Sequence, residues 1–299
     1  MIAQVQRESN SLPLVGPHFV LDRHVSVETR YAPEDNPFET VIVDLTHRCN
    51  MACRNCYIPN RNVPDLNKEW LYRILERLPE RTRIRLVGAE PTVRADLPEI
   101  IARVKRIGHW PILLTNGLKL ASREYVTELK QSGLRLCYLS FNGGFTDAYY
   151  EQIDELPCAE RKRQALENLI DARLYVSLGI IVVRGINEPA VGDVFRHALL
   201  HDPIREIKVR SVGAMGRYMA GDSYSLKELI EVFQEQTGGS LTNGCQTSES
   251  EYLCQFRSGR LKVQMTQWPE LGSQVRGRLA PDGTIQPFFE HVIANEGGY

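Results

Sequence analysis

The chain has 299 residues, enough for one large α/β domain or two medium ones. Its 36 lysine and arginine residues nearly match its 37 aspartate and glutamate residues, so the net charge of −1 gives no support for a nucleic-acid or membrane partner. No apolar run approaches the roughly 18 residues of a membrane span, and the N-terminus has no signal-peptide core. We therefore expect a cytoplasmic protein with reduced thiols.

Short β-branched runs alternate with amphipathic helices after an irregular, proline-bearing extension at residues 1–37. The expected strands cover residues 40–46, 83–89, 111–117, 134–143, 174–185 and 205–213. The helices expected between them are marked by apolar residues at a period of 3.6: residues 67–78, residues 96–107, Val126 and Leu129, Leu166 to Ile170, and Val191 to Ala198.

Six such units predict a partial (β/α)6 barrel of the TIM type over residues 38–218. Active sites in these folds lie at the C-terminal ends of the strands. We expect residues 219–299 to form a small C-terminal α+β cap that shapes the substrate pocket. Its expected elements are a helix with Ser225 as its N-cap and strands at residues 260–268 and 283–289.

Three cysteines, Cys49, Cys53 and Cys56, lie together in the stretch "THRCNMACRNCYIPN" directly after the first expected strand. In a reducing compartment such a group indicates a metal site, because soft thiolates select iron–sulfur clusters, zinc or copper(I). Three thiolates suit three corners of a [4Fe–4S] cube and leave the fourth iron open. Structural zinc needs a fourth ligand, for which His47 is a candidate, although we favour a packing role for it.

"CNMACRNC" resembles the C-x3-C-x2-C signature of the radical S-adenosylmethionine (radical SAM) superfamily. Many members carry an aromatic residue just before the third cysteine, whereas this chain has Asn55 there and Tyr57 just after it. A polar residue at that position resembles the branch of peptide-maturase and haem-d1-pathway enzymes, whose members often carry histidine or another polar residue there. The resemblance implies that Cys49, Cys53 and Cys56 hold a [4Fe–4S] cluster that binds S-adenosylmethionine, with Tyr57 beside the cofactor.

"LVGAEPT" ends the second expected strand and resembles the Gly-Gly-Glu-Pro motif of the same family, with alanine in place of the second glycine. By that match Gly88, Ala89, Glu90 and Pro91 line the cofactor and bind the amino group of its methionine moiety. Edge carbonyls and a carboxylate suit an ammonium donor. The alternative is an ordinary turn with a surface glutamate.

Polar residues also end the third and fourth expected strands: Thr115 and Asn116, then Ser140 and Asn142. The resemblance assigns Ser140 and Asn142 to the ribose or carboxylate of the cofactor. For the asparagines the alternative is turn chemistry, because Asn-Gly pairs favour positive φ.

The last candidates follow the fifth and sixth expected strands. "GIIVVRGINE" resembles the region that approaches the adenine in the family, which makes Ile181, Val183 and Asn187 candidates, although a buried parallel strand explains the apolar run equally well. Arg210 suits a carboxylate or phosphate of the cofactor or substrate, and a surface ion pair is the alternative.

The resemblance implies that reduced flavodoxin or ferredoxin supplies an electron that cleaves S-adenosylmethionine, and that the resulting 5′-deoxyadenosyl radical abstracts hydrogen from a small metabolite or natural-product intermediate. One alternative keeps this chemistry in a maturase of a ribosomal peptide, for which Cys245 and Cys254 would have to join an auxiliary cluster. Another is a structural zinc or iron–sulfur protein. The substrate and the net reaction stay open.

Overall fold

The structure is a computed structural model that describes residues 29–56, 58, 61–213, 223–239, 241, 244–268 and 276–288. Tyr57, predicted to lie beside the cofactor, falls outside the described residues.

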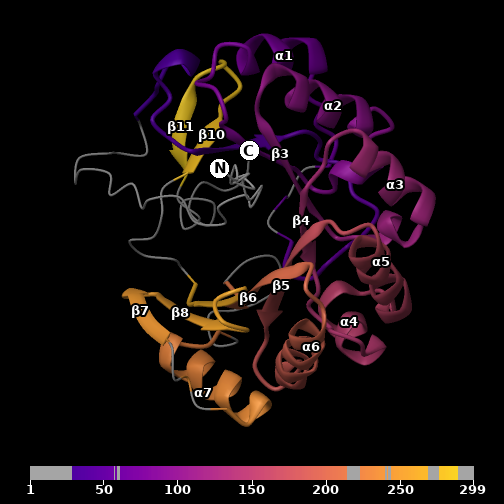
Figure 1. The fold of residues 1–299 in the computed structure, drawn as a ribbon, viewed down its shortest axis with the longest axis vertical. Helices are drawn as coiled ribbons and strands as arrows, with labels where there is room; N and C mark the ends of the chain where they lie inside the picture. Colours follow the sequence, from indigo (N-terminus) through magenta and orange to yellow (C-terminus); the bar gives the residue numbers. More distant parts are fainter. Residues whose placement is uncertain are drawn as a thin grey trace, which may run out of the picture.

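The six predicted strands form the centre of one curved sheet and run parallel in sequence order. They are β1 (Thr40–Asp44), β2 (Arg83–Val87), β3 (Trp110–Thr115), β4 (Leu136–Ser140), β5 (Tyr175–Val182) and β6 (Ile204–Ser211). Helices line the outer side of this sheet (Figure 1). The predicted partial barrel is therefore confirmed.

The predicted helices are also confirmed, and one helix, α4, was not predicted. The helices are α1 (Lys68–Leu75), α2 (Leu97–Ile107), α3 (Arg123–Gln131), α4 (Asp147–Asp154), α5 (Ala159–Asp171), α6 (Glu188–Leu200) and α7 (Leu226–Thr237), with short 3-10 turns η1 (Pro33–Asp35), η2 (Pro91–Val93) and η3 (Leu118–Ala121). Ser225 caps α7 as expected, in a reciprocal capping box with Glu228.

The two faces of the central sheet differ in composition. The outer face packs against the helices through fully buried side chains such as Val43, Leu86 and Leu113. Alternation along β6 places Ile207 and Val209 in this core, so Lys208 between them projects to the concave inner face. The inner face is therefore the polar one.

The C-terminal region extends the same sheet at both edges. Strand β9 (Leu261–Thr266) pairs parallel with β6, and β10 (Arg276–Leu279) pairs parallel with β1. Antiparallel partners follow: β7 (Gly244–Ser248), β8 (Glu251–Phe256) and β11 (Ile285–Phe288). The two predicted strands correspond to β9 and β11. β7, β8 and β10 were missed, and β7 is polar and mostly exposed, so it lacks the expected alternation.

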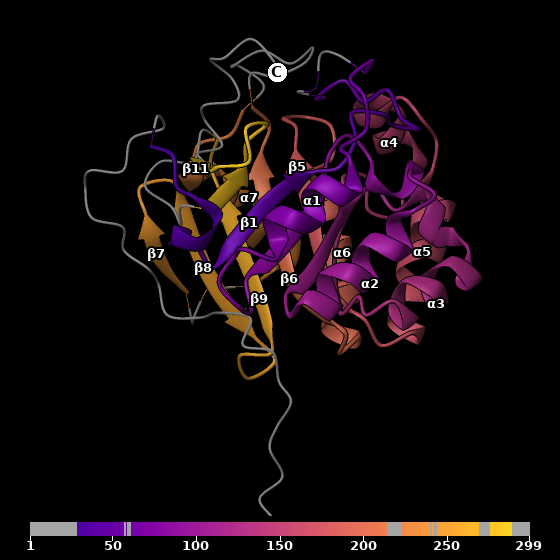
Figure 2. The same cartoon turned by 90° about the horizontal axis from the view of Figure 1, so that it is seen from above.

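The predicted range of each of the six parallel strands extends beyond the residue at which the strand ends. Gly88 and Gly117 adopt positive φ angles of 136° and 82°, which turn the chain out of the sheet after β2 and β3. The residues beyond the strands thus form loops at one edge of the sheet. Figure 2 shows α4 close to the loop that follows β1 at this edge, and Arg54 N donates to Ile153 O there at 3.0 Å.

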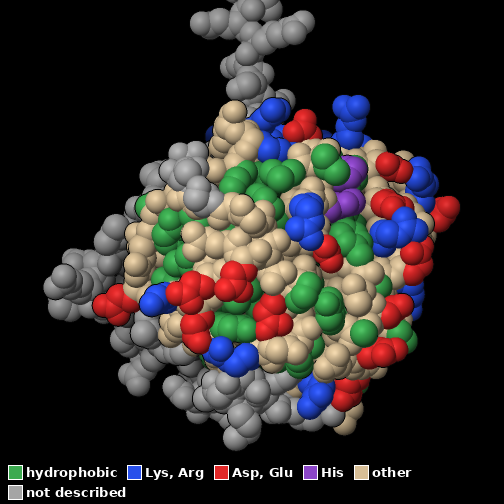
Figure 3. Space-filling view, turned by 90° about the horizontal axis from the view of Figure 1, so that it is seen from below, with side chains coloured by type: hydrophobic (Ala, Val, Ile, Leu, Met, Phe, Trp, Pro, Cys, Tyr) green, Lys and Arg blue, Asp and Glu red, His purple; other side chains and the backbone are tan. Residues whose placement is uncertain are grey.

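The face seen in Figure 3 mixes acidic, basic and hydrophobic side chains. Within the described ranges, no helix is long and apolar enough to cross a bilayer.

Candidate active site

The loop after β1 carries the three cysteines and is fixed at its base to the end of β2. The buried Thr46 donates from its hydroxyl to Asp65 Oδ1 at 2.6 Å and accepts at its carbonyl from Ala89 N at 2.8 Å. Arg48 binds the same carboxylate through Nε at 3.1 Å and Nη2 at 2.5 Å, which holds the pKa of Asp65 below its ordinary value. Because Glu90 N also donates to Arg48 O at 3.0 Å, the two loops form one unit.

The three thiols are half-buried and lie near a cation on one side and an anion on the other. Arg61 Nη2 donates to Cys56 Sγ at 3.0 Å, and the same guanidinium acts electrostatically on Cys49. Cys53 lies against the buried Asp154. Burial raises the pKa of the Cys53 thiol, and the Asp154 carboxylate raises it further.

The donor set fits an iron–sulfur cluster chemically, since three accessible thiols on one loop match the ligands of three irons, and coordination would deprotonate them. Among the residues that the structure describes, no three His, Cys, Asp or Glu side chains are placed to hold a single metal ion. The assignment of Cys49, Cys53 and Cys56 as ligands stays a prediction.

Glu90 is the most heavily hydrogen-bonded acid of the site and has 0% exposure. Its Oε1 accepts from Thr92 N at 3.0 Å, Thr92 Oγ1 at 2.6 Å and Thr115 Oγ1 at 2.6 Å, and its Oε2 accepts from Asn116 N at 2.6 Å. A carboxylate has about four acceptor positions, so these bonds engage both oxygens and join the ends of β2 and β3. The surface-glutamate alternative is therefore wrong.

The remaining residues of this motif shape the backbone next to the cysteine loop. A Cβ on Gly88 would lie 2.3 Å from Thr46 O, so only glycine allows the approach. Ala89 is half-buried and Pro91 is buried at the start of η2.

Asn116 connects the end of β3 to the cysteine loop. Its Nδ2 donates to Asn50 Oδ1 at 2.7 Å and lies 3.9 Å from Cys49 Sγ, while its Oδ1 accepts from Leu118 N at 3.0 Å. The turn role that was the alternative for this residue and the contact with the cysteine loop are therefore both present.

The end of β4 presents one exposed and one buried polar residue. Ser140 is exposed, and its carbonyl accepts from the fully buried Lys162 Nζ at 2.9 Å. Asn142 accepts from Ile181 N at 3.0 Å and donates to Asp154 Oδ1 at 3.3 Å. Asp154 thus lies between Cys53 and the β4–β5 edge.

Asn187 braces the end of β5 and is fully buried. Its Oδ1 accepts from Val183 N at 2.8 Å, and its Nδ2 donates to Asn142 O at 2.7 Å and Ile181 O at 2.8 Å. The Val183 side chain is also buried. The structure therefore puts Asn187 in a position to shape the strand edge through the main chain.

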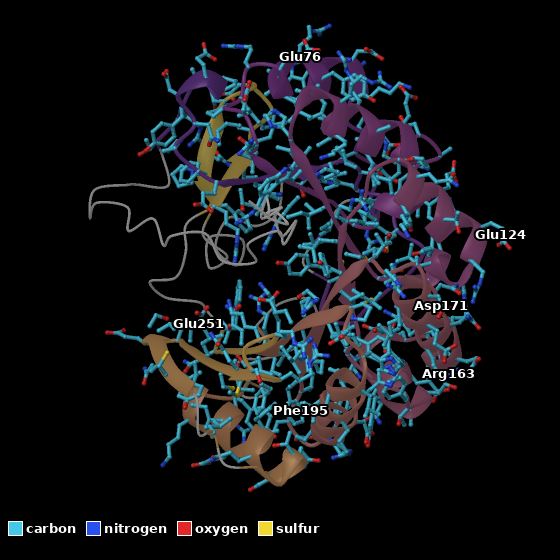
Figure 4. All side chains as sticks on the ribbon, viewed as in Figure 1. Glu76, Glu124, Arg163, Asp171, Phe195 and Glu251 are labelled. Carbon is cyan, nitrogen blue, oxygen red and sulfur yellow. The ribbon has the colours of Figure 1, made fainter. Side chains whose placement is uncertain are left out.

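Figure 4 shows side chains projecting into the concave side of the sheet, and charged residues contact one another on this inner face. Arg85 Nη2 donates to Tyr138 Oη at 3.2 Å, and Lys208 Nζ lies 5.1 Å from the centre of the same ring. These residues come from β2, β4 and β6, which are not neighbours in the sheet. Their contacts therefore cross its concave side.

One carboxylate, Glu206, is shared by two ammonium groups on this face. Lys208 Nζ and Lys262 Nζ lie 3.9 and 3.7 Å from its oxygens, beyond hydrogen-bond length, while Ser177 Oγ donates to it at 2.7 Å. Burial would raise the pKa of Glu206, but Lys208 and Lys262, together with the Ser177 hydroxyl and Arg85, outweigh it and the pKa is lowered. Since Arg85 also acts on this carboxylate, positive charge is in excess here.

One position of the sheet beside this group of charges carries no side chain. Gly179 pairs with Ser140 on one side and Lys208 on the other, and a Cβ added to it would meet only Leu139 O at 3.9 Å. Arg210, predicted to bind an anion, lies two residues further along β6, with its guanidinium carbon 5.7 Å from the Trp268 ring centre.

Cys245 and Cys254 do not face each other. Cys245 pairs with Leu253 across the β7–β8 ladder, so Cys254, next in sequence, points to the opposite face. Cys254 is 1% exposed, and burial raises its pKa to about 12. It behaves as a small core residue.

Sequence reasoning missed several residues of this region, including Arg61, Asp154, Lys208 and Lys262. Arg61 and Asp154 carry no motif, and Asp154 lies on the unpredicted helix. Lys208 and Lys262 had a usable signal, since charges alternate with apolar residues in "REIKVRS" and "RLKVQM".

The fold and the loop define a class: a parallel-barrel enzyme with three cysteines after its first strand. Residues 43–198 match the family described as the Radical SAM superfamily, which is more than half of the chain. The chain belongs to this family. Its members use a [4Fe–4S] cluster and S-adenosylmethionine, so the predicted cofactors are confirmed.

Curated relatives act on small molecules, as their names state. The chain is 33% identical over 217 residues to the 7,8-dihydro-6-hydroxymethylpterin dimethyltransferase of Methanocaldococcus jannaschii, spanning 67% of this chain but 42% of that protein. It is 31% identical over 256 residues to the GTP 3',8-cyclase of Pelotomaculum thermopropionicum, spanning 74% and 77%.

Solved structures share the fold at low identity. SuiB of Streptococcus suis bound to its precursor peptide SuiA aligns with a TM-score of 0.57 at 14% identity, over 66% of this chain and 45% of that one. The enzyme anSMEcpe with bound AdoMet aligns with a TM-score of 0.51 at 16% identity, over 67% and 59%.

Proposed function

We propose that this radical SAM enzyme uses Cys49, Cys53 and Cys56 to hold a [4Fe–4S] cluster and abstracts hydrogen from a small anionic metabolite. The observation that carries the proposal is that the ends of β2 and β3 both contact the cysteine loop. Glu90 does so through its backbone N–H, which donates to Arg48 O, and Asn116 through its side chain, which donates to Asn50. When bound, the cluster and S-adenosylmethionine supply a 5′-deoxyadenosyl radical after reduction. A cytosolic setting and a reduced flavodoxin or ferredoxin as donor belong to the same proposal.

Each residue of the edge has a task in this proposal. Glu90 fixes the β2 loop, so that the half-buried backbone of Gly88 and Ala89 is held ready for the amino group of the cofactor. Asn116 holds the cysteine loop against β3. Ser140 is exposed toward the cofactor, and Asn142, Val183 and Asn187 shape the β4–β5 edge. Rigid placement of this kind is what the protein contributes to cofactor chemistry.

The inner face supports the anionic character of the substrate. Lys208 and Lys262 have 17% and 23% side-chain exposure and share one carboxylate, so they retain donors for a phosphate or carboxylate group. Arg210 stands nearer the cofactor edge. GTP, in the name of one relative, has such a group; this favours a nucleotide-like substrate over an uncharged pterin.

The test is anaerobic reconstitution with iron and sulfide, followed by dithionite reduction and a 5′-deoxyadenosine assay. We expect about four irons per chain and cofactor cleavage in the wild type, and neither in a Cys49→Ala/Cys53→Ala/Cys56→Ala variant. Cys245→Ala, which removes an exposed thiol on β7, is the matched control and should behave as the wild type. Zinc uptake without cofactor cleavage would contradict the proposal.

A further inference from the structure

Arg61 is the cation that contacts the cysteine loop from the side of Cys49 and Cys56. It lies five residues after Cys56 and is half-buried. Its Nη2 to Cys56 Sγ distance of 3.0 Å is short for a hydrogen bond to sulfur, and its charge also acts on Cys49. One guanidinium therefore contacts one predicted ligand and acts electrostatically on a second.

Other cations of this region have different partners. Arg48 pairs with Asp65, and Arg54 Nη1 donates to Gln152 O at 3.4 Å. Lys162 is fully buried and donates to Ser140 O. Arg61 therefore differs from these other cations, because its hydrogen-bond partner is the sulfur of a predicted ligand.

We propose that Arg61 is a positioning residue that donates an N–H···S hydrogen bond to Cys56, a ligand of the cluster, and favours the reduced form of the cluster. This inference rests on the proposed function. Reduction adds one electron, from the external donor, to a cluster that already carries thiolate charge, and Arg61 itself exchanges no proton. Hydrogen bonds to the sulfurs set the reduction potential of such clusters, and a guanidinium keeps its charge at every working pH.

The role is consistent with the charges around the loop. Asp154 at Cys53 disfavours added negative charge, whereas Arg61 at Cys56 and Cys49 favours it. Without Arg61, its positive charge would no longer offset the negative charge of Asp154 near Cys53, so the cluster would be harder to reduce.

The test is the midpoint potential of the reconstituted full chain, measured by EPR-monitored titration without S-adenosylmethionine. The variants are Arg61→Gln, Arg61→Lys and, as the control for removal of an arginine outside the cysteine loop, Arg123→Gln on α3, whose side chain is 65% exposed and pairs with Asp171. At a fixed potential we expect the ratio of reduced to oxidised cluster to fall about tenfold in Arg61→Gln, by less in Arg61→Lys and not at all in Arg123→Gln.

Equal potentials in Arg61→Gln and the wild type at equal iron content would overturn this role. So would an equal shift in Arg123→Gln, which would indicate a general charge effect. Loss of iron from both Arg61 variants would assign Arg61 to cluster retention instead. If the wild type itself takes up no cluster, the proposed function fails; if it cleaves S-adenosylmethionine but the potentials agree, only the inference about Arg61 fails.

Discussion

The loops above the strand ends and the inner face below them differ in how they are built. In the loops, polar groups satisfy one another at hydrogen-bond length, as in the four hydrogen bonds of the fully buried Glu90 and the ion pair of Arg48 with Asp65. On the inner face, Lys208 and Lys262 share Glu206 at distances beyond hydrogen-bond length. A satisfied network fixes geometry, whereas an excess of donors leaves capacity for a ligand.

This difference corresponds to two kinds of recognition. A cofactor common to a family is bound at a fixed edge, where shape must be constant. A substrate that varies between relatives, such as the GTP and the pterin named for two of them, is selected by side chains that the fold does not require. Substitutions in the loops should therefore affect stability and cofactor cleavage together, while those on the inner face should affect substrate binding alone.

The largest effect is expected for Glu90→Ala. It leaves four donors at the β2–β3 edge without their acceptor, so the free energy of unfolding should fall by about 3–5 kcal/mol and cofactor cleavage should be lost. Urea unfolding of the full chain measures the first quantity and the deoxyadenosine assay the second.

The matched control is Glu99→Ala on α2, because Glu99 is 55% exposed and pairs only at the surface with Lys68. We expect a change of at most about 1 kcal/mol and full cleavage activity. If the Glu90→Ala protein were as stable and active as the wild type, the Glu90 network would not fix the geometry of the loops, and the contrast with the inner face would be wrong.

A smaller effect is expected for Lys208→Gln and Lys262→Gln. Each removes one charged donor from the inner face, so calorimetry on the reconstituted protein should show about tenfold weaker binding of GTP and of inorganic triphosphate. Cofactor cleavage without substrate should be unchanged. Lys227→Gln on α7, which is 87% exposed, is the control. Equal weakening in all three variants would indicate bulk charge rather than a site.

The loops could be predicted from the sequence better than the inner face could. The cysteine loop and the Gly88–Pro91 turn are contiguous, so their residues could be identified from spacing and resemblance. Lys208 and Lys262 lie 54 positions apart in the sequence; only the pairing of β6 with β9 brings them to one carboxylate. That pairing is non-local, and the region holding β9 was expected to be a cap. Asp154 was missed with α4, a helix of only eight residues.

The burial of Asn187 was also beyond sequence reasoning. The residue follows an apolar strand, where the resemblance predicts a contact with the adenine of the cofactor and the alternative is a buried parallel strand. Only the three-dimensional structure reveals that its side-chain amide hydrogen-bonds the main chain of Val183, Asn142 and Ile181.

The smallest effect concerns Glu206 and depends on pH. Burial alone would raise its pKa, but Lys208 and Lys262, with the Ser177 hydroxyl and Arg85, lower it below the ordinary value of 4.5, so its charged form stabilises the folded chain above that pH. Glu206→Gln should therefore be less stable than the wild type at about pH 6, and the difference should shrink only as the pH falls below 4.5. Urea unfolding of the unloaded chain at a series of pH values measures this. A difference that disappears already above pH 4.5 would mean that burial outweighs the lysines, and the excess of positive charge assigned to the inner face would then be wrong.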